Sequence, residues 1–434
     1  MLNILDKIAE VPQRLLTSET LPTLILGGGF TGLFTALHLS HQQYTTPTIL
    51  IDREWNFIFK PLLYEFLSGE MNMQFIRHRY DALLHKSGIA FIRDEVQSID
   101  LQQRQVSLAS GLHYTYSNLV LSLGSVAGYF GVKGARENAL AFRTSEDAIA
   151  LAWKLRDCLQ KATQTSEPQQ KKNLLTIAIL GAGCTGVELS ATLADLLPDW
   201  YSPLGGDIAD IRIVVIQRGK QILKGDSDRL RQTAQEALQN RTISVEVMLE
   251  TAVIEIRPNV VVLKRNDQIN DQTEELAAAT IIWTTGIAIN PLIDTLSIPE
   301  GGRDKQGRLK LTDTLQLIDF PEVFAGGDCT VMERPLPATA QVAYQQGVAI
   351  AHNLQALSEC HSPIAFEAGL RGTLMKLGLS DGVAEIYDRY EVKGNLGHLI
   401  RQAAYLQLLP TPARNFKATV EWLSDEMFHC IAGL

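Results

Sequence analysis

The chain has 434 residues, of which 46% are hydrophobic and 20% are charged, and its formal net charge is −9. This length and composition indicate a globular protein of two or three domains and exclude disordered, collagen-like and low-complexity chains. The acidic balance argues against nucleic acid as a partner, because phosphate contacts need a basic surface. The five cysteines lie at least 26 residues apart. Their spacing predicts neither a metal site nor a disulfide framework and fits a reducing compartment.

No targeting or membrane-spanning segment is expected. The N-terminal twenty residues include acidic side chains and lack a continuous apolar run, which argues against a signal or transit peptide. The most apolar long stretch is Leu174–Leu197. Its regularly spaced glycines and the acidic Glu188 favour a buried strand, turn and helix over a membrane span.

One sequence unit occurs twice, near residue 22 and again near residue 175. In each copy an apolar run precedes a G-x-G-x-x-G fingerprint and a helical pattern, with glycines at Gly27, Gly29, Gly32 and at Gly181, Gly183, Gly186. Such glycines permit a tight turn, a close approach of the backbone to a pyrophosphate, and close helix–strand packing. The pyrophosphate then lies at the helix N-terminus. Two copies in one chain predict two bound dinucleotides.

Strand-rich sequence follows each copy and ends before a glycine, which is Gly286 in the second. The expected strands are Ala90–Ile99, Gln105–Leu108, Tyr116–Leu123, Val245–Ile256, Val260–Lys264 and Thr280–Thr284. The pattern predicts an α/β protein with two Rossmann-like dinucleotide-binding domains, joined by a polar connector at 163–173. We expect domains at 20–140 and 291–360 for the first dinucleotide, at 141–290 for the second, and a C-terminal region at 361–434.

The ends of the second strands differ between the copies. Asp52 lies 20 residues after the last glycine of the first fingerprint, where a carboxylate can accept from ribose hydroxyls; a solvated strand-end aspartate is the alternative. The second copy has Gln217 there, followed by Arg218 and nearby lysines. A glutamine does not repel a 2′-phosphate, and arginine binds phosphate well. The pattern favours use of NADPH as well as NADH. The alternative is a solvated basic strand end that gives no preference for either nucleotide.

Four stretches are distinctive: FKPLLYEFLSGE at 59–70, GAGCTGVELS at 181–190, VFAGGDC at 323–329 and TAQVAYQQG at 339–347. Together they resemble the type II NAD(P)H:quinone oxidoreductases, two-dinucleotide flavoproteins, and more narrowly their cyanobacterial and chloroplast branch. The resemblance covers nearly the whole chain. It implies FAD at the first fingerprint and NADPH or NADH at the second. It also implies electron transfer to a membrane quinone, such as demethylphylloquinone or plastoquinone, without proton pumping.

The resemblance also implies roles for individual residues around the two cofactors. Asp328 would hydrogen-bond the ribityl chain of FAD, Gly327 would let the backbone approach it, and residues 61–64 would lie beside the flavin ring. Glu188 would lie near the nicotinamide and influence electron transfer. An acid at this position is also favoured by the helix dipole alone.

Gln341 and Gln345 lie four residues apart and share one face of a predicted helix. The resemblance implies that they line the approach of the quinone to the flavin, where an amide can donate to a quinone carbonyl. From spacing alone, a polar helix face turned to solvent explains the pair as well.

The segment Lys393–Ala418 has four basic residues and no acidic residue. Apolar residues at helical spacing predict a basic amphipathic helix ending before Pro410, suited to a membrane interface; docking on the protein's own core is the alternative. The resemblance implies a membrane-associating C-terminal region. We therefore expect a cytoplasmic protein held peripherally on the cytoplasmic face of a plasma or thylakoid membrane, with a homodimer left open.

Two other functions stay open from the sequence. A sulfide:quinone oxidoreductase shares the implied fold but needs paired cysteines over the flavin. A non-enzymatic redox sensor would bind NAD(P)H as a signal and leave the glutamine pair idle. The scattered cysteines and the intact second fingerprint favour the nicotinamide-dependent quinone reductase.

Overall fold

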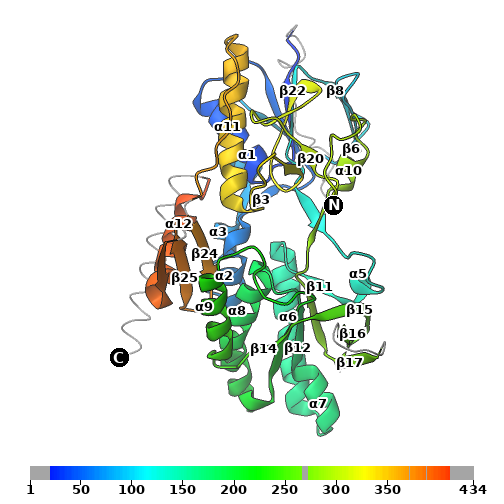
Figure 1. Cartoon of the computed structure of the whole chain (residues 1–434), viewed down its shortest axis with the longest axis vertical. Helices are drawn as coiled ribbons and strands as arrows, with labels where there is room; N and C mark the ends of the chain where they lie inside the picture. The colour runs from blue at the N-terminus through cyan, green and yellow to red at the C-terminus, as the bar shows by residue number, and fades with distance from the viewer. Residues whose placement is uncertain (1–19, 266–271, 371, 388, 411–434) are drawn as a thin grey trace, which may run out of the picture. The chain divides into compact units, whose positions relative to one another are not determined.

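The computed structural model describes residues 20–265, 272–370, 372–387 and 389–410, and Figure 1 shows its elements. The expected absence of a targeting sequence falls on residues outside this part, as do two of the four basic residues of the C-terminal segment. The chain forms two compact units. Within the described residues, the first contains 20–57, 78–126 and 288–369, and the second contains 58–77, 127–287 and 370–410.

The first unit is built around a six-stranded sheet. Its strands, in order across the sheet, are β21 (Gln316–Leu317), β22 (Phe320–Ala325), β9 (Asn118–Leu121), β1 (Thr23–Leu26), β2 (Thr48–Asp52) and β5 (Ala90–Arg93). All neighbours are parallel except β21 and β22. Every residue of β1 is buried, which is typical of a parallel strand covered on both faces.

Two helices of the first unit pack closely against each other (Figure 1). They are α1 (Phe30–His41), which follows β1, and α11 (Ala340–Ser358). The Thr31 hydroxyl donates to the carbonyl oxygen of Ala343 at 3.0 Å. A Cβ atom at Gly347 would lie 2.5 Å from the carbonyl oxygen of Thr31. The helix with the predicted glutamine pair is therefore fixed to the helix of the first fingerprint.

Smaller elements complete the first unit. They are the antiparallel sheet β6 (Val96–Asp100), β7 (Gln105–Leu108) and β8 (His113–Thr115), the pair β20 (Leu309–Lys310) and β23 (Thr330–Val331), and the helices α4 (Tyr80–Leu83) and α10 (Pro291–Asp294). Four short strands lie where the chain passes from one unit to the other: β3 (Asn56–Ile58), β4 (Arg77–Arg79), β10 (Ser125–Ala127) and β19 (Ile287–Ile289).

The second unit repeats the Rossmann arrangement. Its five parallel strands, in order across the sheet, are β11 (Leu140–Ala141), β18 (Thr280–Trp283), β12 (Thr176–Leu180), β13 (Arg212–Ile216) and β14 (Glu246–Met248). Its longer helices are α6 (Ser145–Gln164), α7 (Pro168–Leu175), α8 (Cys184–Tyr201) and α9 (Asp228–Gln239). An antiparallel sheet of β15 (Thr251–Arg257), β16 (Val260–Arg265) and β17 (Thr273–Ala277) shares one hydrophobic core with the parallel sheet.

The C-terminal part of the second unit forms a separate small layer. It consists of the antiparallel sheet β24 (Gly372–Lys376), β25 (Gly382–Ile386) and β26 (Tyr390–Lys393), with α12 (Gly394–Gln407) packed on β25. The layer also packs on α8, which in turn contacts α2 (Leu63–Ser68); the short helices α3 (Met73–Ile76) and α5 (Ala135–Asn138) complete the unit. This arrangement brings sequence-distant segments against the helix of the second fingerprint.

The predicted fold class is confirmed, with local corrections to the expected elements. The polar connector at 163–173 is largely helical, because α7 begins at Pro168, whose fixed φ suits a first helical turn. Two expected strands each divide into two: the first at Asp94 and Glu95, and the second at Glu250, which has a positive φ of 52°.

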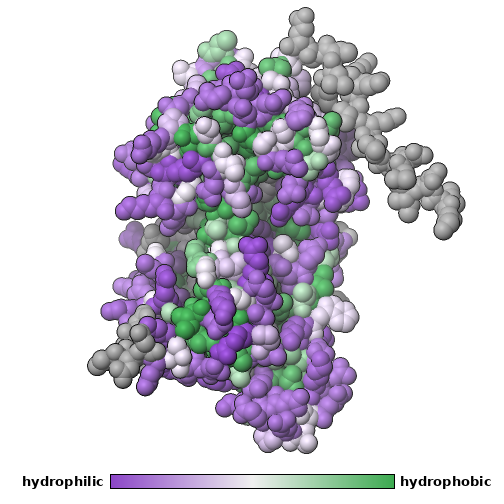
Figure 2. Space-filling view, turned by 90° about the vertical axis from the view of Figure 1, so that its right-hand side faces the viewer, coloured by the Kyte–Doolittle hydropathy of each residue, from purple (hydrophilic) through white to green (hydrophobic). Residues whose placement is uncertain are grey.

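The surface drawn in Figure 2 is mostly hydrophilic, with hydrophobic side chains in smaller areas between the polar ones. In the described part of the chain, no helix is both long enough and apolar enough to cross a membrane.

Candidate active site

The first fingerprint leaves room for a dinucleotide at the N-terminus of α1. Gly27 has a φ of +94°, and a Cβ atom there would lie 2.4 Å from the carbonyl oxygen of Ser122. A Cβ atom at Gly32 would lie 1.9 Å from the carbonyl oxygen of Gly27. At Gly29, by contrast, a Cβ atom would meet nothing within 4 Å. The outer glycines make the turn possible, and the open central one fits a pyrophosphate at the helix N-terminus.

Asp52 is held at the edge of this fingerprint. One carboxyl oxygen accepts from the backbone N–H of Gly28 at 2.6 Å, and the other accepts from the N–H of Glu54 at 2.8 Å. Burial raises the pKa of the Asp52 carboxyl, and these two backbone hydrogen bonds oppose that shift. A carboxylate fixed in this way fits the expected contact with the adenosine ribose of FAD.

Asp328 and Gly327 lie just after β22, at the carboxyl edge of the same sheet. The Ser125 hydroxyl donates to the Asp328 carboxylate at 2.6 Å. Gly327 has a φ of +79°, and its N–H donates to the side-chain oxygen of Gln346 at 2.7 Å. Gln346 is buried and was not predicted as a site residue, although it directly follows Gln345. The adjacent glutamines differ in role because the helix turns one inward and the other outward.

Gln341 and Gln345 share one face of α11, as their spacing predicts. Both side-chain amides donate to the carbonyl oxygen of Gly369, at 3.3 and 3.2 Å. The N–H of Gly369 donates back to the side-chain oxygen of Gln345 at 2.8 Å. Both glutamines are partly exposed. Their amides therefore lie at the surface of the first unit, engaged with the segment that follows α11.

The second fingerprint repeats the geometry of the first. Gly181 has a φ of +113°, and a Cβ atom at Gly186 would lie 1.8 Å from the carbonyl oxygen of Gly181. A Cβ atom at Gly183 would meet nothing within 4 Å. The second unit thus fits a nicotinamide dinucleotide at the N-terminus of α8. Gly286, just beyond β18, has a φ of +62°, and a Cβ atom there would lie 2.2 Å from the ring of Phe130.

Gln217 occupies the place in the second unit that Asp52 occupies in the first. Its side-chain oxygen accepts from the N–H of Ala182 at 3.4 Å, and its amide nitrogen donates to the carbonyl oxygen of Gln221 at 3.3 Å. Arg218 and Lys220 follow on the exposed loop, where the Lys220 ammonium lies 4.0 Å from Glu250. An uncharged side chain with basic neighbours thus borders the fingerprint.

Glu188 is buried, with 8% of its surface exposed. One of its carboxyl oxygens accepts from the backbone N–H of Lys376 at 2.9 Å and lies 3.5 Å from the guanidinium of Arg401. The Tyr64 hydroxyl also hydrogen-bonds it. Burial raises the pKa of the Glu188 carboxyl, and the charge of Arg401 opposes the shift. Such a carboxyl can take up and release a proton nearer to neutral pH than an exposed glutamate.

Further buried charges surround Glu188, and none was predicted from the sequence. The Lys376 and Arg401 side chains are fully buried, as is that of Glu65. The Lys376 ammonium lies 2.8 Å from the Glu70 carboxylate, and the Arg401 guanidinium forms an ion pair with Glu65. Arg401 is one of the four basic residues of the C-terminal segment, and the structure buries it completely. Charged residues within apolar helical and strand segments were the only available signal, since their partners lie far away in sequence.

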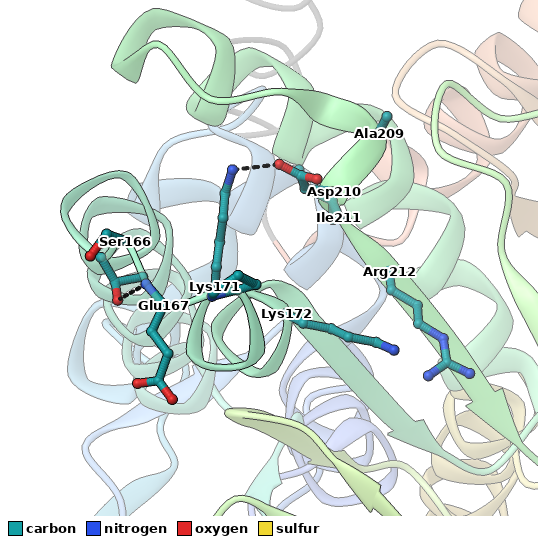
Figure 3. A pocket seen from close by; sticks show the side chains of 10 residues that line it. Ser166, Glu167, Lys171, Lys172, Ala209, Asp210, Ile211 and Arg212 are labelled. Carbon is teal, nitrogen blue, oxygen red and sulfur yellow. Dashed lines mark hydrogen bonds and ion pairs between the residues drawn. The ribbon is translucent and has the colours of Figure 1, made fainter.

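Figure 3 shows a cavity of about 750 Å³ elsewhere in the second unit. It lies at the amino ends of β12 and β13, beside α7. The Lys171 ammonium pairs with Asp210 at 2.6 Å, and Arg212 pairs with Glu246 at 2.7 Å. Because the fingerprint lies at the carboxyl ends of these strands, this cavity is not part of the nucleotide site.

A family model described as pyridine nucleotide-disulphide oxidoreductase matches residues 22–347. The chain belongs to this family. It is 33% identical to demethylphylloquinone reductase NdbB of Synechocystis sp., over 92% of this chain and 95% of that protein. It is 30% identical to the alternative NAD(P)H-ubiquinone oxidoreductase C1, chloroplastic/mitochondrial, of Arabidopsis thaliana, over 94% of this chain and 81% of that protein.

Two solved structures of this family's fold are also similar. NDH2 from Plasmodium falciparum in complex with NADH has a TM-score of 0.83 at 19% identity, covering 94% of this chain and 98% of that one. The sulfide:quinone oxidoreductase from Aquifex aeolicus has a TM-score of 0.72 at 19% identity, covering 89% and 90%. At 19% identity, these structural similarities support the fold alone. The resemblance to type II NAD(P)H:quinone oxidoreductases is confirmed by the sequence relatives, and the chain is an enzyme of that kind, using FAD and NAD(P)H.

Proposed function

We propose that this enzyme oxidises NADPH as well as NADH and reduces a membrane quinone such as demethylphylloquinone or plastoquinone. The observation that carries the proposal is the pair of matched fingerprints, each with an open central glycine at a helix N-terminus. The relatives named for demethylphylloquinone and ubiquinone reduction support the choice of acceptor. NADPH, one proton and the quinone yield NADP⁺ and the quinol, so electrons and protons balance.

Bound FAD would supply the two-electron carrier between the nicotinamide and the quinone. The first unit would hold it without a covalent bond, with Gly29 open to the pyrophosphate and Asp52 and Asp328 available to hydroxyl groups. Acid precipitation should therefore release all of the yellow colour. Flavin that stays in the protein pellet would contradict non-covalent binding.

Glu188 is the proposed acid–base group of the nicotinamide side. It lies on α8, two residues after the last fingerprint glycine, and is the carboxyl around which Tyr64, Lys376 and Arg401 gather. We place it beside the nicotinamide ring, where its charge state would affect hydride departure.

Gln341 and Gln345 are the proposed quinone-side residues. Their amides already donate to Gly369, so contact with a quinone carbonyl requires these bonds to be exchanged. The segment after α11 has no regular secondary structure as far as Leu370, which leaves it free of the ladder hydrogen bonds that would oppose such an exchange.

Peripheral membrane attachment through α12 is the third part of the proposal. This helix turns its polar residues His398, Arg401 and Gln402 inward, while Leu396 is 58% exposed. Tyr387 and Tyr390, before and within β26, are 66% and 61% exposed, and tyrosine favours membrane interfaces. We place this surface on the cytoplasmic face of a plasma or thylakoid membrane.

The membrane proposal is tested by sedimentation with anionic liposomes. Leu396→Glu should reduce binding, because a charge then replaces an exposed apolar side chain. Leu204→Glu is the matched control, since Leu204 is 46% exposed elsewhere in the second unit. Equal liposome binding by both variants and the wild type would remove α12 from the membrane contact.

The enzymatic proposal is tested by anaerobic stopped-flow spectroscopy. NADPH should bleach the flavin, and a naphthoquinone or plastoquinone should restore its colour. Bleaching by sulfide instead would favour the sulfide:quinone oxidoreductase alternative, although the cysteines of the described part are all free thiols. Bleaching without reoxidation by any quinone would favour the redox sensor.

A further inference from the structure

Arg401 is the largest fully buried side chain of the described chain, and it comes from the C-terminal helix. Its guanidinium pairs with Glu65 on α2 and donates to the carbonyl oxygen of Pro61 at 2.9 Å. The nitrogen that contacts Pro61 lies 3.5 Å from the Glu188 carboxyl. Arg401 thus spans three segments that are far apart in sequence.

Docking of α12 alone does not account for this arginine. Burying a charge is costly, and a buried ion pair can often be replaced by apolar residues with no loss of stability. The helix already has apolar residues such as Leu396 and Ile400, yet Leu396 faces outward and Ile400 is only partly buried. Leu406 is buried at the end of the helix, but the full burial of a charged side chain beside the exposed Leu396 indicates that the charge is used inside.

Glu188 is the group on which that charge acts. The titratable side chains that face it are Tyr64 and Glu65 from α2, Lys376 from β24, Arg401 and Tyr405 from α12, and Cys184 from its own helix α8. Lys376 presents its backbone N–H to Glu188, and its ammonium is bound to Glu70 and Glu65. Arg401 therefore supplies the positive charge nearest to the Glu188 carboxyl among these groups.

We propose that Arg401 is a positioning residue, which holds the Glu188 carboxyl from the C-terminal helix and ties its charge state to the seating of α12. The functional consequence rests on the proposed place of Glu188 beside the nicotinamide. The contact between Arg401 and Glu188 itself lies within the second unit. Loss of the guanidinium leaves Glu188 and Glu65 as neighbouring carboxyls without the cation between them, so protonation of Glu188 becomes easier.

The experiment is an infrared titration of the buried carboxyl band in the FAD-loaded enzyme, with Glu188→Gln used to assign the band. Arg401→Gln should raise the midpoint of Glu188 by roughly 1 to 3 pH units. Arg401→Lys keeps a positive charge, but a single ammonium cannot contact Glu65, Pro61 and Glu188 together. A smaller rise of the Glu188 midpoint is therefore expected. Glu65→Gln should move the midpoint downward, because it removes a like charge.

The matched control is Arg241→Gln. Arg241 is another poorly exposed arginine of the second unit, and it bonds Asp195 on α8 and Asp381 before β25 at 3.2 and 2.7 Å. Its loss should leave the Glu188 midpoint unchanged. An unchanged midpoint in folded Arg401→Gln would overturn the proposal. If that variant does not fold, an unchanged midpoint in Arg401→Lys would do the same.

The pH profile of flavin reduction by NADPH separates this inference from the proposed function. Its midpoint should follow the infrared midpoint in each variant, and the pH dependence should disappear in Glu188→Gln. Infrared shifts with no change in the reduction profile would leave the Arg401–Glu188 coupling standing and remove Glu188 from the nicotinamide reaction.

Discussion

The two dinucleotide-binding folds of this chain share one backbone frame. In each, a hydroxyl just after the closing strand hydrogen-bonds two carbonyl oxygens at the start of the fingerprint, at 2.8–3.0 Å. In the first copy the Ser122 hydroxyl donates to Leu26 and Gly27. In the second copy the Thr284 hydroxyl donates to Leu180 and Gly181. In each, the N–H of the first glycine donates to the end of the second strand at 2.8 Å. The frame at each fingerprint therefore varies little, because the same backbone groups and one hydroxyl hold the turn in both copies.

The two folds differ at side chains that the shared frame places equivalently. Two residues after the third glycine, Phe34 packs against the ring of Tyr344 with centroids 4.6 Å apart, whereas Glu188 joins a buried charge cluster. At the second strand end, the carboxylate of Asp52 is replaced by the amide of Gln217. The comparison teaches that the two copies share a backbone that fits a dinucleotide and differ in the side chains that surround it, which is where the predictions below look for their different roles.

The largest effect is expected when a substitution distorts one fingerprint turn and leaves the other intact. Gly32→Ala and Gly186→Ala would each force a Cβ atom to within 2 Å of a carbonyl oxygen in the preceding turn, at 1.9 and 1.8 Å. The turn must then distort, so each variant should lose its own dinucleotide. Gly32→Ala should be purified without flavin. Gly186→Ala should keep flavin but be reduced by NADPH more than ~100-fold slower.

The ratio of flavin to protein absorbance and the stopped-flow reduction rate measure these two outcomes. Gly183→Ala is the matched control for the fold, because its Cβ atom meets nothing within 4 Å. It should unfold at the wild-type temperature and weaken only nucleotide binding. Loss of flavin from Gly186→Ala would show that the two frames are not independent.

The shared frame is also the part that sequence reasoning could reach. Glycine spacing after a buried strand is a local pattern, and it located both fingerprints. Apolar strand-like runs are local patterns too, and they located the strand ends near Asp52 and Gln217 and the strand Gln105–Leu108 at its observed bounds. Local patterns also located α12, which ends before Pro410 as expected.

The charge cluster of the second unit was out of reach for a physical reason. Glu65, Glu188, Lys376 and Arg401 come from four elements separated by up to 336 residues. No local periodicity links them. The residue spacing in α12 showed an apolar and a polar face, but it could not show that the polar face is buried. That burial depends on the carboxylates of Glu65 on α2 and Glu188 on α8.

A second prediction tests the charge cluster of the second unit. Burial alone would raise the pKa of Glu65, but Arg401 and then Lys376 outweigh it and lower that pKa to about 2. A carboxyl whose folded pKa is depressed stabilises the fold above its unfolded value near 4.5 and loses this effect as the pH falls toward 2. Glu65→Gln should therefore destabilise the protein by about 3–5 kcal/mol at pH 7.

Urea unfolding of wild type and Glu65→Gln at several pH values measures this effect. The difference in free energy of unfolding should be largest above pH 4.5 and should shrink at lower pH. Glu137→Gln, at an exposed glutamate of the same unit, should change stability by less than ~0.5 kcal/mol. A pH-independent difference for Glu65→Gln would contradict the assigned ionisation.

A third prediction separates the quinone side from the nicotinamide side. Replacing Gln341 and Gln345 together by leucine removes two amide donors from the exposed face of α11. Flavin reoxidation by quinone should slow by ~10- to 100-fold if two hydrogen bonds to the quinone are lost. Reduction by NADPH should stay at the wild-type rate. Gln355→Leu on the same helix is the control, and equal slowing of both half-reactions would make the glutamines structural.

The smallest expected effect concerns the strand end at which the two copies differ most simply. Gln217→Glu restores to the second copy the kind of carboxylate that Asp52 supplies in the first. The new charge would lie beside the N–H of Ala182, which Gln217 now contacts at 3.4 Å. There it can accept from a ribose 2′-hydroxyl and repel a 2′-phosphate. The ratio of kcat/KM for NADH over that for NADPH should rise roughly 10-fold, a change of ~1.4 kcal/mol.

Steady-state rates with both nucleotides at one ionic strength measure this ratio, since phosphate contacts are screened by salt. Gln239→Glu adds the same charge at an exposed position of α9 and should leave the ratio unchanged. The exposed Arg218 and Lys220 remain in both variants, so any difference reports on the strand-end side chain itself. A wild-type enzyme that strongly prefers NADH would contradict the argument at its first step, because Gln217 would then not permit the 2′-phosphate.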